Sequence, residues 1–378
     1  MINQDEVVKV FYKYGVEFFC GVPDSYLNGF CTYLTENSPP GKHIIAANEG
    51  NAVALASGHY FMSGSVPLVY MQNSGMGNAL NPLVSLVDKH VYHVPMVLLI
   101  GWRGAPTDND HMQHKTQGEI TLKLLDLLNI PYKIVEDDDS AIDETVGWAV
   151  KTAKGSRAPA ALIAKKSVFA ESSKKPPKDD SFPMSREDAI KVVLDNAPDD
   201  AIFVATTGRA TRELYFLRDE RGETHDNDVL NVGSMGHASS IVMGIALADK
   251  NRKVICLDGD SAAIMHMGAL TTISKHGIPN IIHIILNNGA HESVGGQPSA
   301  GHRIDFEKVA QSCGYRAATV NTEGALVEAL KRFSDGKIAS FIDARIKQGM
   351  RPVLPPLNLD HDMIISGFMN KNTLKGAR

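Results

Sequence analysis

The chain has 378 residues and a formal net charge of −5, with 43% hydrophobic and 21% charged residues. This length accommodates two domains of ordinary size, and the composition is that of a globular protein. The charge disfavours nucleic acid and anionic membranes as partners, and no apolar run approaches the roughly 20 residues of a membrane helix. No signal peptide is visible at the N-terminus. Four scattered cysteines without CxxC spacing are typical of reduced thiols in a cytoplasmic protein.

The first domain is predicted to occupy residues 1–166, because strands and helices alternate along this stretch. A helix over residues 4–14 opens it. The predicted strands cover residues 16–22, 43–47, 67–71, 95–101 and 158–164. Polar residues follow these strands, and Glu49 is the most informative of them.

A segment over residues 167–184, rich in proline, serine and charge, predicts a linker. Ser185 and Asp188 then have the spacing of a capping box that opens a helix. The second domain is predicted over residues 185–350, with strands at 201–205, 229–232, 254–257, 281–286 and 339–344. The tail, 351–378, begins as an extended proline-rich stretch and is expected to finish in a short helix near residues 363–369.

Residues 254–290 organise the second domain, because two apolar strands there flank a predicted helix over residues 261–275. Strands without polar alternation are typical of a parallel sheet that is buried on both faces. Asp260 and Asn288 follow these strands and are therefore expected at the same edge of the sheet. A carboxylate and an amide oxygen suit a hard divalent cation, and the adjacent helix start suits phosphate. The alternative is an ordinary strand–helix–strand unit with turn residues at its strand ends.

Gly259-Asp260-Ser261, followed after 25 intervening residues by Asn287-Asn288, resembles the signature of thiamine-diphosphate enzymes. Ser261 stands where the third glycine of that signature usually lies. The resemblance implies thiamine diphosphate and Mg²⁺ as cofactors. It also implies that Gly259, Asp260, Ser261 and Asn288 bind the cofactor, and that Asp260, Asn288 and Ala290 bind the metal.

Other segments are similar to cofactor-binding parts of the same family, so the resemblance covers nearly the whole chain. It implies that Glu49 activates the cofactor through its pyrimidine ring, whereas the local sequence alone also allows a solvated loop glutamate. The residues implied to support the cofactor in the second domain are Thr207, Gly208, Ser234, Met235 and Gly236. The implied fold is two doubly wound parallel α/β domains, one pyrimidine-binding and one diphosphate-binding, without the middle domain of longer members.

The short form of the chain resembles the phosphonopyruvate decarboxylases and, more distantly, the sulfopyruvate decarboxylases. This resemblance implies that a small anionic 2-oxo acid, phosphonopyruvate, is converted to phosphonoacetaldehyde and carbon dioxide. Such a substrate requires cations, and the segment after the fourth strand supplies Arg103, His114 and Lys115. A polar surface loop is the alternative for this segment.

Asp24, His111 and Glu213 are further candidates for catalytic acid–base residues, although Glu213 could instead pair with Arg209 along a helix. Three alternatives to the substrate assignment stay open: a sulfopyruvate decarboxylase, a carboligase of the acetolactate synthase type and a non-catalytic cofactor-binding subunit. In the family, the glutamate that Glu49 matches and the metal site that meets it in one cleft usually come from different subunits. The resemblance therefore implies at least a homodimer with active sites at the subunit interface.

Overall fold

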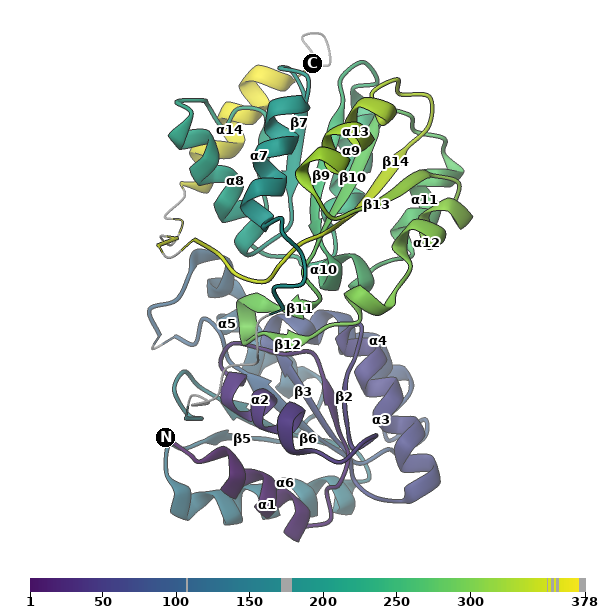
Figure 1. The fold of residues 1–378 in the computed structure, drawn as a ribbon. Coiled ribbons are helices and arrows are strands. Elements are labelled where there is room, and N and C mark those ends of the chain that lie inside the picture. The colour runs from purple at the N-terminus through teal and green to yellow at the C-terminus, as the bar shows by residue number, and fades with distance from the viewer. Residues whose placement is uncertain (107, 171–178, 352, 355–356, 358–359, 374–378) are drawn as a thin grey trace. The chain divides into compact units, whose positions relative to one another are not determined.

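The structure, a computed structural model, describes residues 1–106, 108–170, 179–351, 353–354, 357 and 360–373. Contacts divide the chain into two compact units, residues 1–176 with 293–297 and residues 177–292 with 298–378. Each unit is an α/β domain built on a six-stranded sheet (Figure 1), which confirms the predicted fold class. Parts of the predicted linker and tail lie outside the described residues. Within the described parts, no helix is long and apolar enough to cross a membrane.

The sheet of the first unit is entirely parallel, with the strand order β2-β1-β3-β4-β6-β5. Its strands are β1 (Phe19–Gly21), β2 (His43–Ile45), β3 (Leu68–Gln72), β4 (Met96–Gly101), β5 (Tyr132–Val135) and β6 (Pro159–Ala164). Five of them lie within or overlap the predicted strands. β5 was not predicted, because it is a short edge strand whose first three residues are only half-buried, so it lacks a continuous apolar run.

Helices cover both faces of this first sheet, since alternate strand residues point to opposite sides. The helices are α1 (Gln4–Lys13), α2 (Asn28–Asn37), α3 (Glu49–Ser63), α4 (Met76–Ser85), α5 (Met112–Leu127) and α6 (Asp139–Ser156). One buried cluster joins α1, α2 and α6 to one face, and another joins α3, α4 and α5 to the other. The predicted helix over residues 4–14 is confirmed by α1.

The second unit repeats the topology of the first. Its main strands are β7 (Ile202–Ala205), β8 (Asp228–Leu230), β9 (Val254–Gly259), β10 (Ile281–Asn287), β13 (Arg316–Val320) and β14 (Ser340–Arg345). They are parallel, in the order β8-β7-β9-β10-β14-β13, which is the arrangement of β2-β1-β3-β4-β6-β5. β13 was not predicted, and like β5 it is an edge strand with partly exposed residues.

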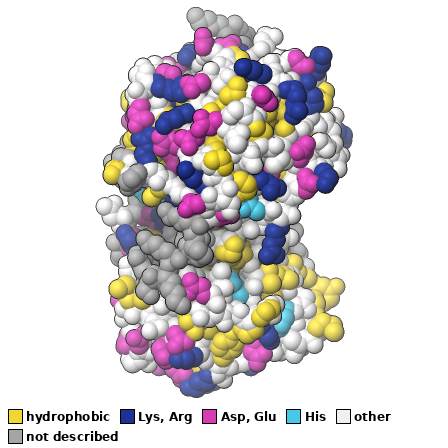
Figure 2. Space-filling view, in the orientation of Figure 1, with side chains coloured by type: hydrophobic (Ala, Val, Ile, Leu, Met, Phe, Trp, Pro, Cys, Tyr) yellow, Lys and Arg dark blue, Asp and Glu magenta, His cyan; other side chains and the backbone are white. Residues whose placement is uncertain are grey.

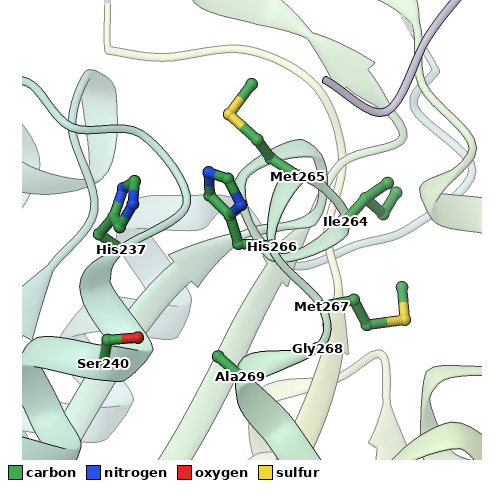
Figure 3. Close-up of a pocket in the computed structure, with 8 residues that line it drawn as sticks. All are labelled: His237, Ser240, Ile264, Met265, His266, Met267, Gly268 and Ala269. Atoms are coloured by element: carbon green, nitrogen blue, oxygen red, sulfur yellow. The ribbon is translucent and has the colours of Figure 1, made fainter. Parts of the chain in front are cut away.

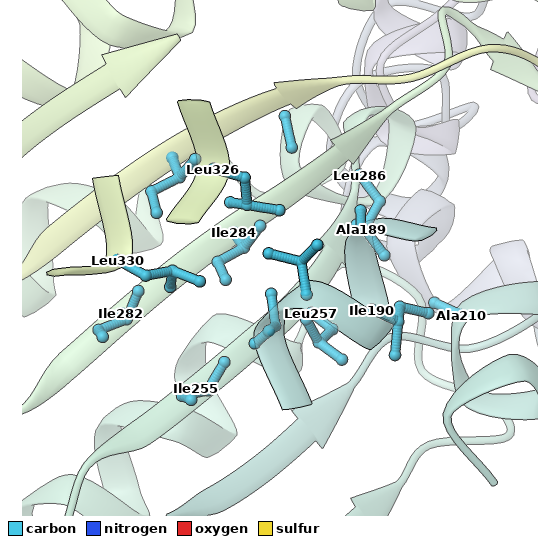
Figure 4. Close-up of a cluster of buried hydrophobic side chains, with 14 of the residues drawn as sticks. Ala189, Ile190, Ala210, Ile255, Leu257, Ile282, Ile284, Leu286, Leu326 and Leu330 are labelled. Atoms are coloured by element: carbon cyan, nitrogen blue, oxygen red, sulfur yellow. The ribbon is translucent and has the colours of Figure 1, made fainter. Parts of the chain in front are cut away.

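Helices also cover both faces of the second sheet. They are α7 (Arg186–Asn196), α8 (Arg209–Glu220), α9 (Ala238–Ala248), α10 (Asp260–Met265), α11 (Ala269–Lys275), α12 (Phe306–Ser312), α13 (Glu323–Phe333) and α14 (His361–Asn372). The cluster in Figure 4 packs α7, α8 and α13 on one face, with Ile190, Leu326 and Leu330 against strand residues such as Ile284. The other face carries α9, α11 and α12.

The predicted single helix over residues 261–275 is wrong, because the structure divides it into α10 and α11. The break falls at His266, which leaves the helical conformation with φ −133° and ψ 44°. The predicted capping box at Ser185 and Asp188 is confirmed by reciprocal bonds of 3.0 and 3.1 Å between the side chain of one and the backbone N–H of the other. It fixes the start of α7, and therefore the place of Arg186.

The strand order determines where a ligand can bind in each unit. The connection after β7 leads to β8 on one side of the sheet, whereas the connection after β9 leads to β10 on the other side, so the direction reverses between β7 and β9. Ligands of open parallel sheets bind beyond the carboxyl ends of the strands at such a reversal. In the second unit these ends are followed by Thr206 and by Asp260, and in the first unit the equivalent ends of β1 and β3 are followed by Asp24 and Asn73.

Candidate active site

Glu49 is held at the N-terminus of α3 as a buried carboxylate. The residue is 5% exposed, and the side-chain amide of Asn78 donates to its Oε2 over 2.7 Å. A Cβ atom at Gly75 would collide with the Glu49 carboxyl group, so only glycine allows this approach. The sequence pattern pointed to Glu49 but not to Asn78, because a hydrogen bond between residues on two different helices leaves no local pattern.

Asn73 connects the ends of β3 and β4. It is 1% exposed, and its amide donates to the backbone carbonyl of Arg103 over 2.8 Å and to Thr121 Oγ1 over 2.9 Å. The backbone N–H of Arg103 donates back to Asn73 Oδ1 over 3.3 Å. Asn73 therefore fixes the backbone from which the Arg103 side chain extends.

Arg103 is engaged by neighbouring residues rather than free. Its Nε and one terminal nitrogen donate to the two oxygens of Asp110 over 2.7 and 2.6 Å, and its other terminal nitrogen donates to Ser25 Oγ over 2.8 Å. The guanidinium also lies 4.9 Å from the ring centre of Tyr26. Asp110 was not among the predicted site residues. The two-point contact between Arg103 and Asp110 has the geometry in which arginine binds phosphate and carboxylate groups.

Asp24 lies at the carboxyl end of β1 and is completely buried. The backbone N–H of Tyr26 donates to its Oδ2 over 2.9 Å, while Oδ1 has no hydrogen-bond partner among the described residues. Burial raises the pKa of the Asp24 carboxyl to about 6, although the nearby Arg103 acts in the opposite direction. Asp24 can therefore hold a proton close to neutral pH.

The expected cationic role of His114 is not supported. Burial and the charge of Arg103 lower the pKa of His114 to about 4, so its imidazole is neutral at neutral pH. A neutral imidazole can still donate one hydrogen bond. His111, which precedes α5, and Lys115, in its first turn, are both exposed, so neither is held toward a buried ligand in this conformation.

Glu213 is not available as an acid–base residue. It lies on α8, is 1% exposed, and receives hydrogen bonds from Arg186 to both carboxylate oxygens over 2.8 and 2.9 Å. The alternative pairing with Arg209 is also not observed, because Arg209 pairs with Glu292 over 2.8 Å. The buried ion pair between α7 and α8 gives Glu213 a structural role, and we leave it out of the catalytic set.

The loops after β7 and β8 lie at the edge of the second sheet where a diphosphate is expected. Gly208 has φ 99° and precedes α8, so the free N–H groups of that helix follow Thr207 directly. The side chain of Asn231 donates to the carbonyl of Ala205 over 2.9 Å and ties the second loop to β7. Ser234 and Gly236 both have positive φ, and Met235 between them is half-buried.

The metal candidates Asp260, Asn288 and Ala290 are all buried in the second unit. Asp260 begins α10 and accepts a hydrogen bond from the hydroxyl of Ser299. Burial raises the pKa of the Asp260 carboxyl to about 6. Asn288 follows β10, and its Oδ1 accepts from the backbone N–H of Ala290 over 3.2 Å.

These residues fit a Mg²⁺–diphosphate group in their donor chemistry. Asp260 and Asn288 offer the carboxylate and amide oxygens that Mg²⁺ prefers. The Ser261 hydroxyl is shielded from solvent and has no hydrogen-bond partner among the described residues, so it can bond to an added oxygen ligand. Serine at the third position of the signature thus supplies a polar group where glycine would supply none.

Asn287, the other residue of the asparagine pair, has a structural role. It is completely buried, and its amide donates to Asp343 Oδ1 over 2.9 Å and to the carbonyl of Gly301 over 3.1 Å. None of the predicted site residues lines the open pocket in Figure 3, although Gly236 packs against its lining residues His266 and Met265. The pocket lies between the start of α9 and the α10–α11 turn, where the rings of His237 and His266 are 4.5 Å apart.

Each of the two units matches a profile of a known protein family. A family profile described as the N-terminal TPP binding domain of thiamine pyrophosphate enzymes matches residues 3–125, and the C-terminal TPP binding domain profile matches residues 207–344. A phosphonopyruvate decarboxylase of Streptomyces viridochromogenes is 32% identical over 336 residues, which is 84% of this chain and 81% of the relative. The sulfopyruvate decarboxylase of Methanosarcina acetivorans is 29% identical, with 92% of each chain covered.

Proposed function

Because the chain belongs to the thiamine pyrophosphate enzyme family, we propose that it decarboxylates phosphonopyruvate to phosphonoacetaldehyde and carbon dioxide. The observation that carries the proposal is the 32% identity to a phosphonopyruvate decarboxylase over 84% of the chain. The Arg103 fork supports it, since it already binds a carboxylate in the two-point manner that suits a phosphonate. Asp24 at the carboxyl edge of the first sheet, and Asp260 and Asn288 at that of the second, support it as well.

In the proposed reaction, the bond between the carboxylate and the 2-oxo carbon breaks, carbon dioxide leaves, and a proton takes its place. Bound thiamine diphosphate supplies the acceptor for the electron pair that this bond releases. Glu49 would hold a proton against the pyrimidine ring, while Asp260 and Asn288, with the Ala290 carbonyl, would hold Mg²⁺. Asp24, whose pKa is raised to about 6, is the proposed donor of the replacing proton.

We further propose a homodimer in which the Glu49 half-site of one subunit meets the metal half-site of the other. The support is an apolar surface on α3, α4 and the segment that follows α4. Figure 2 shows hydrophobic side chains gathered over α3 and α4, and the exposed residues are Leu55, Phe61, Met62, Leu80, Val84, Val91 and Tyr92. Exposed patches of this kind mark interaction surfaces. The surface lies on the same helix, α3, that begins with Glu49, so a partner covering it would extend along this helix toward the Glu49 end.

The substrate is tested by aldehyde release from phosphonopyruvate, sulfopyruvate and pyruvate, each with and without thiamine diphosphate and Mg²⁺. We expect cofactor-dependent turnover with a kcat/KM for phosphonopyruvate at least about 100-fold above that for pyruvate, because pyruvate lacks the phosphonate group that the Arg103 guanidinium could bind at two points. Faster turnover of sulfopyruvate would contradict the phosphonate assignment and favour the second candidate, which the 29% identical sulfopyruvate decarboxylase supports. Acetolactate formation from pyruvate would instead indicate a carboligase.

A further inference from the structure

The Glu292 carboxylate receives hydrogen bonds from three donors in the second unit and forms an ion pair with a fourth residue, Arg209. Arg186 and Asn288 donate to its Oε2, each over 2.9 Å. The backbone N–H of Gly349 donates to Oε1 over 2.5 Å, and Arg209 forms an ion pair with the same oxygen over 2.8 Å while donating a hydrogen bond to the Glu292 backbone carbonyl over 2.9 Å. These partners come from the starts of α7 and α8, from the end of β10 and from the segment after β14, so Glu292 connects four parts of the second sheet's carboxyl edge.

Such a carboxylate is held on both of its oxygens. Two hydrogen bonds reach Oε2, and one hydrogen bond and the ion pair with Arg209 reach Oε1. Two of these four partners are positively charged arginines, and a carboxylate accepts strong hydrogen bonds and ion pairs from such groups. Glu292 is therefore suited to holding its neighbours in place.

The neighbour that matters is Asn288, because its amide group has two chemically different ends. Glu292 can only accept hydrogen bonds, so the amide nitrogen must face it, and Oδ1 must point the other way. Gln348 donates to the backbone carbonyl of Asn288 over 3.2 Å and restrains the main chain at the same position. The oxygen is the end that a divalent cation requires. Its direction is set by Glu292, which the metal would not contact, together with the Ala290 N–H that donates to Oδ1 over 3.2 Å.

We propose that Glu292 is a positioning residue for the metal site, which orients the Asn288 carboxamide so that its oxygen faces the cation. The inference rests on the proposed function, in which Asn288 is a Mg²⁺ ligand. Arg186 and Arg209 hold Glu292 in turn, and Glu213 holds Arg186 from the opposite side. The contacts thus run from Glu213 through Arg186 and Glu292 to Asn288, and the Glu213–Arg186 ion pair is the part farthest from the metal site.

The test compares Glu292→Gln with Glu213→Gln. Both variants remove one carboxylate partner of Arg186, but only Glu292→Gln replaces the acceptor that faces Asn288. We expect Glu292→Gln to weaken Mg²⁺ affinity by about 10-fold to 100-fold, the usual cost of losing a residue that supports a metal ligand. Glu213→Gln should bind Mg²⁺ within about threefold of wild type, because Glu292 keeps its contacts to Arg209 and Asn288. The measurement is calorimetric titration of Mg²⁺ in saturating thiamine diphosphate without substrate.

Three outcomes separate the possibilities. Weak Mg²⁺ binding by Glu292→Gln alone, with turnover restored by high Mg²⁺, supports the positioning role. Wild-type Mg²⁺ affinity in Glu292→Gln, while Asp260→Ala binds none, overturns this inference and leaves the proposed function intact. Unchanged Mg²⁺ affinity in Asp260→Ala places the metal elsewhere and defeats the proposed site itself. If Glu292→Gln does not fold, Glu292→Asp keeps an acceptor-only group one methylene short, and the same loss of affinity is expected.

Discussion

Glu49→Gln is expected to lower kcat by about 100-fold to 10,000-fold, the usual contribution of a positioned acid–base residue, while thiamine diphosphate and Mg²⁺ stay bound. Glutamine has the shape of glutamate, which matters because Gly75 leaves no space for a larger side chain. Its amide oxygen can still accept the hydrogen bond from Asn78, so the side chain should keep its place. The amide cannot share a proton as a carboxyl group does. The substitution therefore removes the acid–base function of residue 49 and keeps its shape and its hydrogen bond.

The measurement pairs kcat for aldehyde release with calorimetric titration of the cofactor. Glu328→Gln, an exposed glutamate on α13, is the matched control and should behave as wild type. Unchanged turnover in Glu49→Gln would contradict the proposed role of this carboxylate. Loss of cofactor binding together with turnover would also contradict it, because Glu49 would then act in binding rather than in activation.

Asp260→Ala is expected to weaken the binding of Mg²⁺ and of thiamine diphosphate together, each by more than about 100-fold. This estimate follows because losing only a residue behind a metal ligand already costs 10-fold to 100-fold. The two affinities should fall together, since the cation would join the protein to the diphosphate oxygens. Activity should then be absent at ordinary cofactor concentrations.

Loss of binding in this variant should not reflect unfolding. Burial raises the pKa of Asp260, so its ionised form is disfavoured in the metal-free protein, and a neutral replacement removes that cost. We expect the thermal midpoint of metal-free Asp260→Ala, or of the isosteric Asp260→Asn, to equal or exceed that of metal-free wild type. Retained affinity for both ligands in a folded variant would show that the cation binds at another position.

The central part of the fold could be predicted because its signals are local. The apolar runs of β9 and β10 and the polar residues that follow them lie within one segment, and both family profiles confirm the cofactor that they indicated. Strands β5 and β13 carry no such run, since Lys133, Arg316 and Thr319 interrupt their apolar residues and most of their residues are partly exposed. The break between α10 and α11 was also missed, because the apolar spacing continues through it.

Contacts between distant residues could not be predicted in the same way. The ion pair that decides the role of Glu213 joins residues 27 positions apart on α7 and α8, and Arg186 and Glu292 lie 106 positions apart. Arg103 and Asp110 are only 7 positions apart, but they lie in a segment between β4 and α5 that has no regular spacing to predict their contact. Sequence position alone presents Arg103 as a free cation and Glu213 as a free acid. The charges around them, and not their residue types, determine what each can do.

The most direct test of the account is whether the two half-sites act in one catalytic centre across a dimer interface. Glu49→Gln and Asp260→Ala chains would be co-expressed with different tags, and the mixed dimer isolated. One of its two sites would combine an intact Glu49 with an intact Asp260, so we expect about half of wild-type turnover per dimer, while each parent variant stays inactive. A mixed dimer as inactive as its parents would contradict a site shared between subunits.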